Sequence, residues 1–213
     1  MHGKKKKEEM GEKPENAQNQ GIKMIITFTA LGISIIILTF ISDFFVSFII
    51  CLIGYIVHTL GHYSEHGESN TRKNSLIQFI GVIIVFIGWI AYIFMIINDP
   101  IKIYDFFLLS LVIGISLTAL GFYICYMAMG LRKGFREQDD LITTGIYGIF
   151  RHPLYIGLIL FHIGIPLIFS GYMTLLSSIF WIPIVFVWMK IDEITLKKIY
   201  GEEYIEYMKK TIF

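Results

Sequence analysis

The fold class is most clearly indicated by residues 154–189, LYIGLILFHIGIPLIFSGYMTLLSSIFWIPIVFVWM. This long stretch contains no Asp, Glu, Lys or Arg. Ser170-Gly171 separates the two apolar runs within it. A helix rises about 1.5 Å per residue, so roughly 20 apolar residues cross the roughly 30 Å hydrocarbon core of a bilayer. Barrel strands would instead be about ten residues long with alternating polarity. The sequence therefore predicts an all-α, polytopic membrane helix bundle, with helices at the following apolar runs: Ile22–Ile41, Phe44–Leu60, Leu76–Ile97, Phe106–Leu131, Leu154–Phe169 and Tyr172–Met189.

The whole chain has the composition of a membrane protein. Of its 213 residues, 55% are hydrophobic and 16% are charged, and the mean hydropathy is +0.65. One soluble core cannot hide so much apolar surface, so we expect the lipid bilayer to surround the protein. The net charge is +1, without a basic face, which argues against a nucleic-acid partner. Cys51 and Cys125 lie in apolar runs, where we expect each thiol to act as a small hydrophobe.

We expect two parts along the chain. Residues 1–20 are polar and lack periodicity, which predicts a disordered cytoplasmic tail, and residues 21–213 then form one membrane domain. The first run is too long for a signal-peptide core, so no cleavage is expected. Ser42-Asp43 joins the first two runs and Ser170-Gly171 the last two, so each pair should form a tight antiparallel hairpin. Because Pro166 and Pro183 interrupt the last pair, it could instead be one kinked or re-entrant unit, which leaves five or six spanning helices open.

The placement of Lys and Arg predicts the orientation in the membrane. The amino-terminal tail and the loops at 61–75 and 131–153 carry these residues, whereas the other side offers only Lys102. Cytoplasmic loops carry an excess of Lys and Arg. We therefore predict a multi-pass protein with both termini and both long loops in the cytoplasm.

Two polar blocks flank the last apolar pair. The first contains Tyr147, Arg151, His152 and Tyr155, and the second begins with Asp192-Glu193. A turn at the far end of the hairpin would bring the blocks together, so that cations and carboxylates close a cytosolic-facing pocket. The alternative is plain anchoring at the membrane interface, where Arg, Tyr and amphipathic helices collect. In that interpretation the lipid headgroups contact Ile194, Leu196, Ile199, Tyr204 and Ile205.

The histidines outside these blocks favour structural roles. Three of them recur every four residues, at His58, His62 and His66, a spacing that metal sites also use. Gly61 makes a continuous helix there doubtful, so we predict no metal site. His162 lies inside an apolar run, and we expect it to form a hydrogen bond between helices.

The two polar blocks resemble the isoprenylcysteine carboxyl methyltransferase family of integral membrane enzymes, which is related to the phospholipid N-methyltransferases. Four stretches between about 131 and 213 carry the resemblance: Leu141-Ile-Thr-Thr-Gly-Ile-Tyr147, Phe150-Arg-His-Pro-Leu-Tyr-Ile-Gly157, Asp192-Glu-Ile-Thr-Leu196 and Tyr200-Gly-Glu-Glu-Tyr-Ile-Glu-Tyr207. The resemblance implies that this catalytic part binds S-adenosyl-L-methionine in a cytosolic-facing pocket formed by the carboxyl-terminal hairpin and its flanking loops. The residues implied to bind this cofactor are Asp140, Leu141, Ile142, Tyr147, His152, Pro153, Leu154, Tyr155, Asp192 and Glu193.

The resemblance also implies an activity and a substrate class. Arg151 and Glu193 become the candidate catalytic residues, and Trp188 and Lys190 the candidate substrate-binding residues. Trp188 stands where relatives that methylate a prenylated cysteine have a substrate-binding arginine, and Asp192 stands where the family usually has Glu. The implied function is methyl transfer to a lipidic or prenylated acceptor, such as a prenylcysteine carboxylate. A phospholipid amine or a small thiol as acceptor, a membrane reductase and a non-catalytic scaffold remain alternatives.

Overall fold

The computed structural model describes the backbone of residues 2–41, 43–66, 75–132 and 141–212, and the side chains of residues 20–40, 43–61, 79–132 and 141–212. Within these ranges the regular structure is helical, apart from two isolated β-bridges, Lys102 to Gly171 and Phe150 to Ile212. The predicted all-α class is confirmed. The elements are the α-helices α1 (His2–Ile41), α2 (Phe44–His66), α3 (Ser75–Ile97), α4 (Phe107–Leu131), α5 (Pro153–Ile168), α6 (Tyr172–Tyr200) and α7 (Glu202–Lys210), and the 3-10 helix η1 (Gly145–Gly148).

In the part of the chain that the structure describes, five helices are long and apolar enough to cross a membrane, namely α1, α2, α3, α4 and α6. The remaining apolar helix, α5, has 16 residues and falls short of a full crossing by length alone. The chain is thus an integral membrane protein, and each predicted apolar run lies in a helix. The structure contains no membrane, so the orientation with both termini in the cytoplasm stays a prediction.

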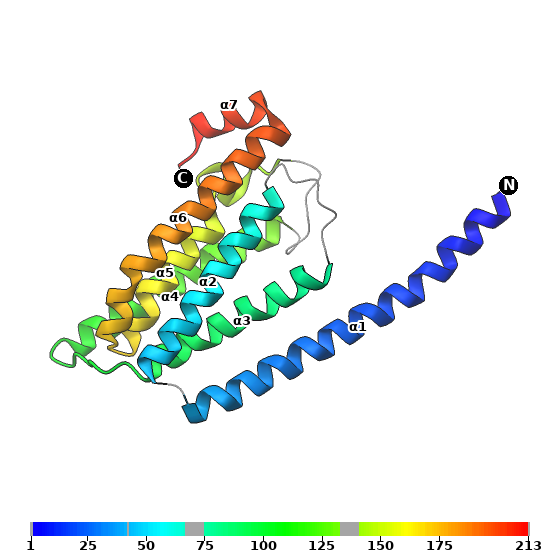
Figure 1. Ribbon diagram of the computed structural model, residues 1–213. Helices are drawn as coiled ribbons and strands as arrows, with labels where there is room; N and C mark the ends of the chain where they lie inside the picture. Colours follow the sequence, from blue (N-terminus) through cyan, green and yellow to red (C-terminus); the bar gives the residue numbers. More distant parts are fainter. Residues whose placement is uncertain (1, 42, 67–74, 133–140, 213) are drawn as a thin grey trace.

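Helix α1 differs from the prediction in two ways. Its backbone is helical from His2, whereas we expected an irregular tail up to residue 20. Lys, Glu and Gln favour helices, so polarity alone does not prevent one. Helix α1 also packs against α3 rather than α2 and leans away from the rest of the bundle (Figure 1). The tight hairpin predicted for the first pair is therefore wrong, because apolar length specifies a helix without specifying its neighbour.

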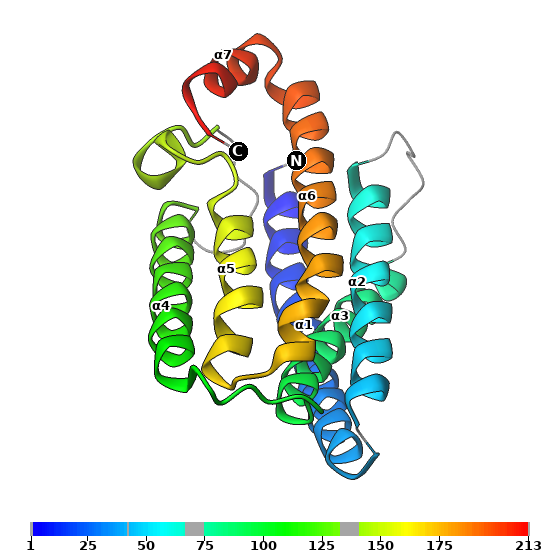
Figure 2. The same cartoon turned by 90° about the vertical axis from the view of Figure 1, so that its left-hand side faces the viewer.

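The last pair does form the predicted antiparallel hairpin. Helices α5 and α6 pack side by side, with α4 on the outer side of α5 (Figure 2). Helix α4 approaches α5 closely because glycines face each other. A Cβ atom at Gly157 would lie 2.3 Å from Cys125 Sγ and 3.0 Å from the Gly121 carbonyl oxygen. Small residues let membrane helices pack backbone to backbone, which fixes the first turn of α5 on a rigid support.

The core lies where α2, α3, α5 and α6 meet. Cys51 is fully buried there, as predicted, and so is Trp181. His162 of α5 contacts the hydroxyl of Tyr55 of α2 through Nε2, and its Nδ1 lies 2.8 Å from the Leu158 carbonyl oxygen. Because that carbonyl requires an N–H at Nδ1, Nε2 accepts the tyrosine proton. The predicted hydrogen bond between helices at His162 is confirmed.

Helix α6 is longer than its apolar run. It continues past Met189 through the acidic pair to Tyr200 and ends at Gly201, whose φ of 54° favours glycine. Helix α7 then folds back toward η1 (Figure 2), and Ile212 pairs with the segment before α5. The residues that the anchoring interpretation assigned to the headgroups are thus divided between two helices, with Ile194, Leu196 and Ile199 in α6 and Tyr204 and Ile205 in α7.

Asp99 anchors the opposite end of α6. One carboxylate oxygen, Oδ2, accepts hydrogen bonds from the backbone N–H and the hydroxyl of Thr174, both at 2.7 Å. The other, Oδ1, accepts from the N–H of Ile101 at 3.0 Å and of Met173 at 3.4 Å. These bonds satisfy free N–H groups in the first turn of α6, as a capping residue does.

Candidate active site

The two polar blocks meet at Glu193. Arg151 Nη2 lies 3.3 Å from Glu193 Oε1, and His152 Nε2 lies 3.7 Å from the same oxygen. The three side chains are largely buried, with exposed fractions of 14%, 5% and 6% for Arg151, His152 and Glu193. The predicted meeting of residues 151–152 with the acidic pair is confirmed as direct contact. We call Arg151, His152, Lys190 and Glu193 the ionic cluster.

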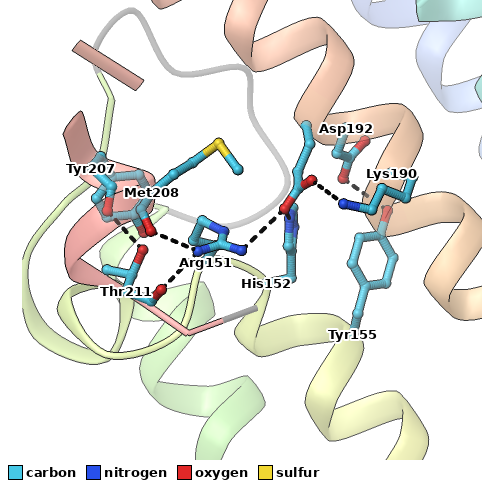
Figure 3. A network of polar contacts seen from close by, with 9 residues as sticks. Arg151, His152, Tyr155, Lys190, Asp192, Tyr207, Met208 and Thr211 are labelled. Atoms are coloured by element: carbon cyan, nitrogen blue, oxygen red, sulfur yellow. Dashed lines mark hydrogen bonds and ion pairs between the residues drawn. The ribbon is translucent and has the colours of Figure 1, made fainter. Parts of the chain in front are cut away.

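The fourth member of the ionic cluster is exposed. Lys190 stands one turn before Glu193 on α6, and its Nζ lies 2.8 Å from Glu193 Oε2 (Figure 3). The Lys190 side chain is 75% exposed. Glu193 therefore has buried cationic and imidazole partners on one oxygen and an exposed cation on the other.

Arg151 also ties the carboxyl-terminal segment to the cluster. Its Nη1 donates to the carbonyl oxygens of Met208 at 3.1 Å and Thr211 at 2.7 Å (Figure 3). The backbone N–H of Arg151 donates to the Ile212 carbonyl oxygen at 3.1 Å. One guanidinium, with its five donors in a fixed fork, thus joins α7, the start of α5 and Glu193 of α6.

Asp192 and Trp188 belong to the same end of α6. The Tyr155 hydroxyl donates to Asp192 Oδ2 at 3.0 Å, which joins α5 to α6 a second time. Trp188 is 2% exposed, and its indole N–H donates to the Thr59 hydroxyl at 2.8 Å. The ring also packs against His58 of α2, with 4.4 Å between ring centroids. Trp188 thus joins this end of α6 to α2 through ring packing and a hydrogen bond.

Several buried polar atoms at this site have no hydrogen-bond partner in the described part of the chain. They are Arg151 Nε, His152 Nε2 and the Tyr204 hydroxyl oxygen, and three further hydroxyls of this kind lie elsewhere in the bundle. Tyr204 is 0% exposed and stands close enough to Glu193 to respond to its charge. Buried polar atoms are normally paired, so a group of unpaired ones beside a carboxylate is suited to a polar ligand.

Burial sets the protonation of the groups around the cluster. It lowers the pKa of His152, although the Asp192 and Glu193 carboxylates partly oppose this, so the imidazole is neutral at pH 7. Burial raises the pKa of Tyr204, and the Glu193 charge adds to the rise. Burial also raises the pKa of Tyr207 to about 12. At pH 7 both phenols are therefore proton donors.

The remaining residues predicted for the cofactor have different surroundings. Pro153 is buried in the first turn of α5. The Leu154 carbonyl oxygen lies 3.9 Å from Cys125 Sγ on the side of α4. Tyr147 of η1 is buried, and its carbonyl oxygen accepts a 2.6 Å hydrogen bond from Tyr207. Leu141 and Ile142 are half-buried in the segment before η1, and Asp140 lies outside the described residues.

Sequence reasoning missed some residues of the site. It treated Arg132 only as an orientation signal. Burial raises the pKa of Tyr147, and the charge of Arg132 is the largest effect that opposes this rise. Tyr204 was assigned to the headgroups in the anchoring interpretation, and its full burial contradicts that placement. The spacing of Tyr204 and Tyr207, three residues apart on one face of α7, was the available signal. The side chains of His62 and His66 lie outside the described residues, although α2 continues through Gly61 to His66.

Comparison with known proteins confirms the resemblance. A model of the phospholipid methyltransferase family matches residues 106–203, which include α4, α5, α6 and the ionic cluster. Protein-S-isoprenylcysteine O-methyltransferase of Xenopus laevis is 38% identical over 80 residues, 35% of this chain and 26% of that protein. The chain thus spans about a quarter of the length of this curated relative. No solved structure matches the chain.

Proposed function

We propose that this protein is an S-adenosyl-L-methionine-dependent methyltransferase that acts on a lipidic or prenylated acceptor at the cytosolic face of the membrane. The observation that carries the proposal is the buried contact of Arg151 and His152 with Glu193. The family match over residues 106–203 supports methyl transfer as the reaction. The absence of charge along most of α5 and α6 supports an acceptor that arrives through the bilayer.

The residues of the site suit this cofactor. The Glu193 carboxylate would hold an ammonium group, and the unpaired donors Arg151 Nε and Tyr204 Oη would hold a carboxylate. Tyr155 and the neighbouring Trp188 offer electron-rich faces that attract a cation. When bound, S-adenosyl-L-methionine would supply a methyl group activated by its sulfonium charge.

The protein's contribution to the reaction would then be positioning and exclusion of water. The glycine contacts between α4 and α5 and the Asp99 cap of α6 hold the two blocks rigidly, and α7 covers them. Holding two reactants in line replaces an encounter in solution with a bound geometry, which lowers the barrier. A carboxylate acceptor is already ionised at pH 7, so no side chain has to remove a proton from it. For an amine or thiol acceptor, Glu193 is the candidate base.

Ligand binding tests the cofactor assignment directly. The purified protein in nanodiscs is titrated with S-adenosylhomocysteine and, separately, with NADPH, and Trp fluorescence and calorimetry report binding. The proposal expects saturable binding of S-adenosylhomocysteine alone. Binding of NADPH instead would assign the chain to the reductases, and binding of neither would favour a scaffold.

Methyl transfer tests the acceptor. The protein is incubated with methyl-labelled S-adenosyl-L-methionine and, in parallel, with N-acetyl-S-farnesylcysteine, phosphatidylethanolamine and a small alkyl thiol. Label in the farnesylcysteine ester would establish a prenylcysteine carboxylate as acceptor, and label in one of the other two would reassign it. His152→Ala should abolish labelling, whereas Lys209→Gln, on the exposed face of α7, should leave it unchanged.

A further inference from the structure

The three partners of Glu193 differ in how freely they can leave it. Arg151 is held by the carbonyl oxygens of Met208 and Thr211, and His152 is buried at the start of α5. Lys190 instead reaches Glu193 Oε2 from outside, with a side chain that is 75% exposed (Figure 3). Water and salt compete for the exposed Lys190 ammonium, so this contact is weaker than one between two buried charges. Lys190 is therefore the partner that a ligand can displace at little cost.

A ligand that displaces Lys190 from Glu193 must itself be cationic. Glu193 Oε2 faces Lys190 Nζ at 2.8 Å, the length of a charge-assisted hydrogen bond. A primary ammonium has the same charge and the same donors as a lysine Nζ. In the proposed function such an ammonium belongs to the amino-acid part of the cofactor, so this inference rests on that function.

We propose that Lys190 exchanges partners during the catalytic cycle. It leaves Glu193 to the ammonium of the methyl donor and turns to an anionic group on the lipidic acceptor, either a carboxylate or a phosphodiester. Trp188, one turn before Asp192 on α6, is buried and donates its indole N–H to Thr59, so it offers no donor to an acceptor. Lys190, two residues further along α6 and exposed, then supplies the cation for the acceptor. The donor and the acceptor consequently promote each other's binding.

The exchange predicts an unusual effect of removing Lys190 on donor binding. In Lys190→Gln the ammonium meets no competitor at Glu193, so S-adenosylhomocysteine should bind about two- to fivefold more tightly, a modest gain because water already screens the exposed Lys190 ammonium. Methylthioadenosine lacks the amino-acid part, and its affinity should not change. Lys209→Gln is the matched control, because Lys209 also pairs with a glutamate three residues away on an exposed helix face.

The exchange also predicts coupling between donor and acceptor, which linkage requires to be reciprocal. With saturating S-adenosylhomocysteine, wild-type protein should bind N-acetyl-S-farnesylcysteine about fivefold or more tightly than without it, the usual lower range of such coupling. Its neutral carboxamide should show no such gain. A parallel titration with dihexanoylphosphatidylethanolamine identifies the phosphodiester as the anion if the gain appears there instead. In Lys190→Gln the gain should be lost in both titrations.

The outcomes separate this inference from the proposed function. If wild-type protein binds no S-adenosylhomocysteine, the proposed function fails and the inference fails with it. If it binds this ligand but Lys190→Gln weakens the binding, Lys190 contacts the donor itself and only the exchange is wrong. Persistence of the coupling in Lys190→Gln would overturn the exchange in the same way.

Discussion

Helix α6 has a buried carboxylate near each end, and the two are held in different ways. Asp99, at the end where α6 begins, is bound by the backbone N–H groups of Ile101, Met173 and Thr174 and by one hydroxyl. Glu193, near the other end, is bound by the charged side chains of Arg151 and Lys190. Both residues are almost fully buried: counting backbone and side chain together, Asp99 is 6% exposed and Glu193 is 4% exposed. Burial of a carboxylate therefore does not by itself distinguish a structural residue from a site residue.

The difference lies in whether the partners are neutral and fixed or charged and replaceable. Backbone N–H groups cannot move without unfolding the turn, so Asp99 stabilises one arrangement of the chain. The Lys190 side chain can rotate away, and unpaired donors remain around Glu193. We infer that the Asp99 end is a structural anchor and the Glu193 end a binding site. The following predictions test that contrast in order of decreasing effect.

Glu193→Gln should produce the largest change at the binding end. Removing one partner of a buried charge pair costs about 2–5 kcal/mol, so affinity for S-adenosylhomocysteine should fall by about 30-fold or more. Calorimetry at a temperature where both proteins are folded measures the change. Glu206→Gln, exposed on α7, is the control and should bind normally. Near-normal affinity of Glu193→Gln would remove the contrast between the two carboxylates.

Asp99→Ala should lower stability and leave binding intact. Hydrogen bonds to charged groups contribute about 1.5–3 kcal/mol, so the free energy of unfolding should fall by about 2 kcal/mol. Chemical denaturation in detergent measures the loss, and affinity for S-adenosylhomocysteine below the transition should change by less than about twofold. A large loss of affinity without a loss of stability would show that the two ends of α6 are not separate in function.

His152 predicts how the binding end responds to acid. Burial lowers the pKa of His152 in the folded protein, whereas in the unfolded chain the group takes up a proton near pH 6.5. Below pH 6.5 the unfolded state therefore binds more protons, and stability decreases as the pH falls toward the lowered pKa. Between pH 6.5 and 5.5 wild-type protein should lose up to about 1 kcal/mol more than His152→Gln. Equal slopes in denaturation at several pH values would contradict a buried, neutral His152.

Tyr207→Phe should have the smallest effect, on the attachment of α7. The variant loses the 2.6 Å hydrogen bond from the hydroxyl to the Tyr147 carbonyl oxygen. A single hydrogen bond of this kind contributes roughly 0.5–1 kcal/mol, and hydrogen exchange in residues 145–151 should increase accordingly. Tyr126→Phe, exposed on α4, provides the comparison and should exchange like wild type. Unchanged exchange in Tyr207→Phe would show that the hydrogen bonds of Arg151 and Ile212 are sufficient to hold the carboxyl-terminal segment.

The sequence predicted the helices well and the packing of α1 poorly. Each apolar run could be recognised by itself, because a segment that crosses hydrocarbon must satisfy its own backbone hydrogen bonds. The hairpin of α5 and α6 followed from the short Ser170-Gly171 turn between two runs. The Ser42-Asp43 connection is equally short, yet α1 packs against α3. The packing partner of a membrane helix depends on how well the side chains fit along the whole helix, and not on the length of the connection.

The candidate site was predictable as a set of residues and not as a set of contacts. Arg151, His152 and Glu193 were recognisable from two polar blocks at the ends of one hairpin, and the structure joins them. The carbonyl oxygens of Met208 and Thr211 that bind Arg151 carry no signal in the sequence, because every residue has a carbonyl. The influence of Arg132 on Tyr147 likewise depends on where α4 ends beside η1.

The order of residues is enough to identify this chain as a helical membrane protein with charged blocks at the ends of its last apolar hairpin. Apolar length and the placement of charge are local properties. Each segment that crosses the hydrocarbon core must meet these requirements by itself. The packing of the helices was needed to see that Lys190 and Arg151 both contact the Glu193 carboxylate. Lys190 is exposed there, whereas Arg151, which comes from a distant segment, is buried. Contacts of 3–4 Å between distant segments depend on how whole helices pack, and no single segment contains that information.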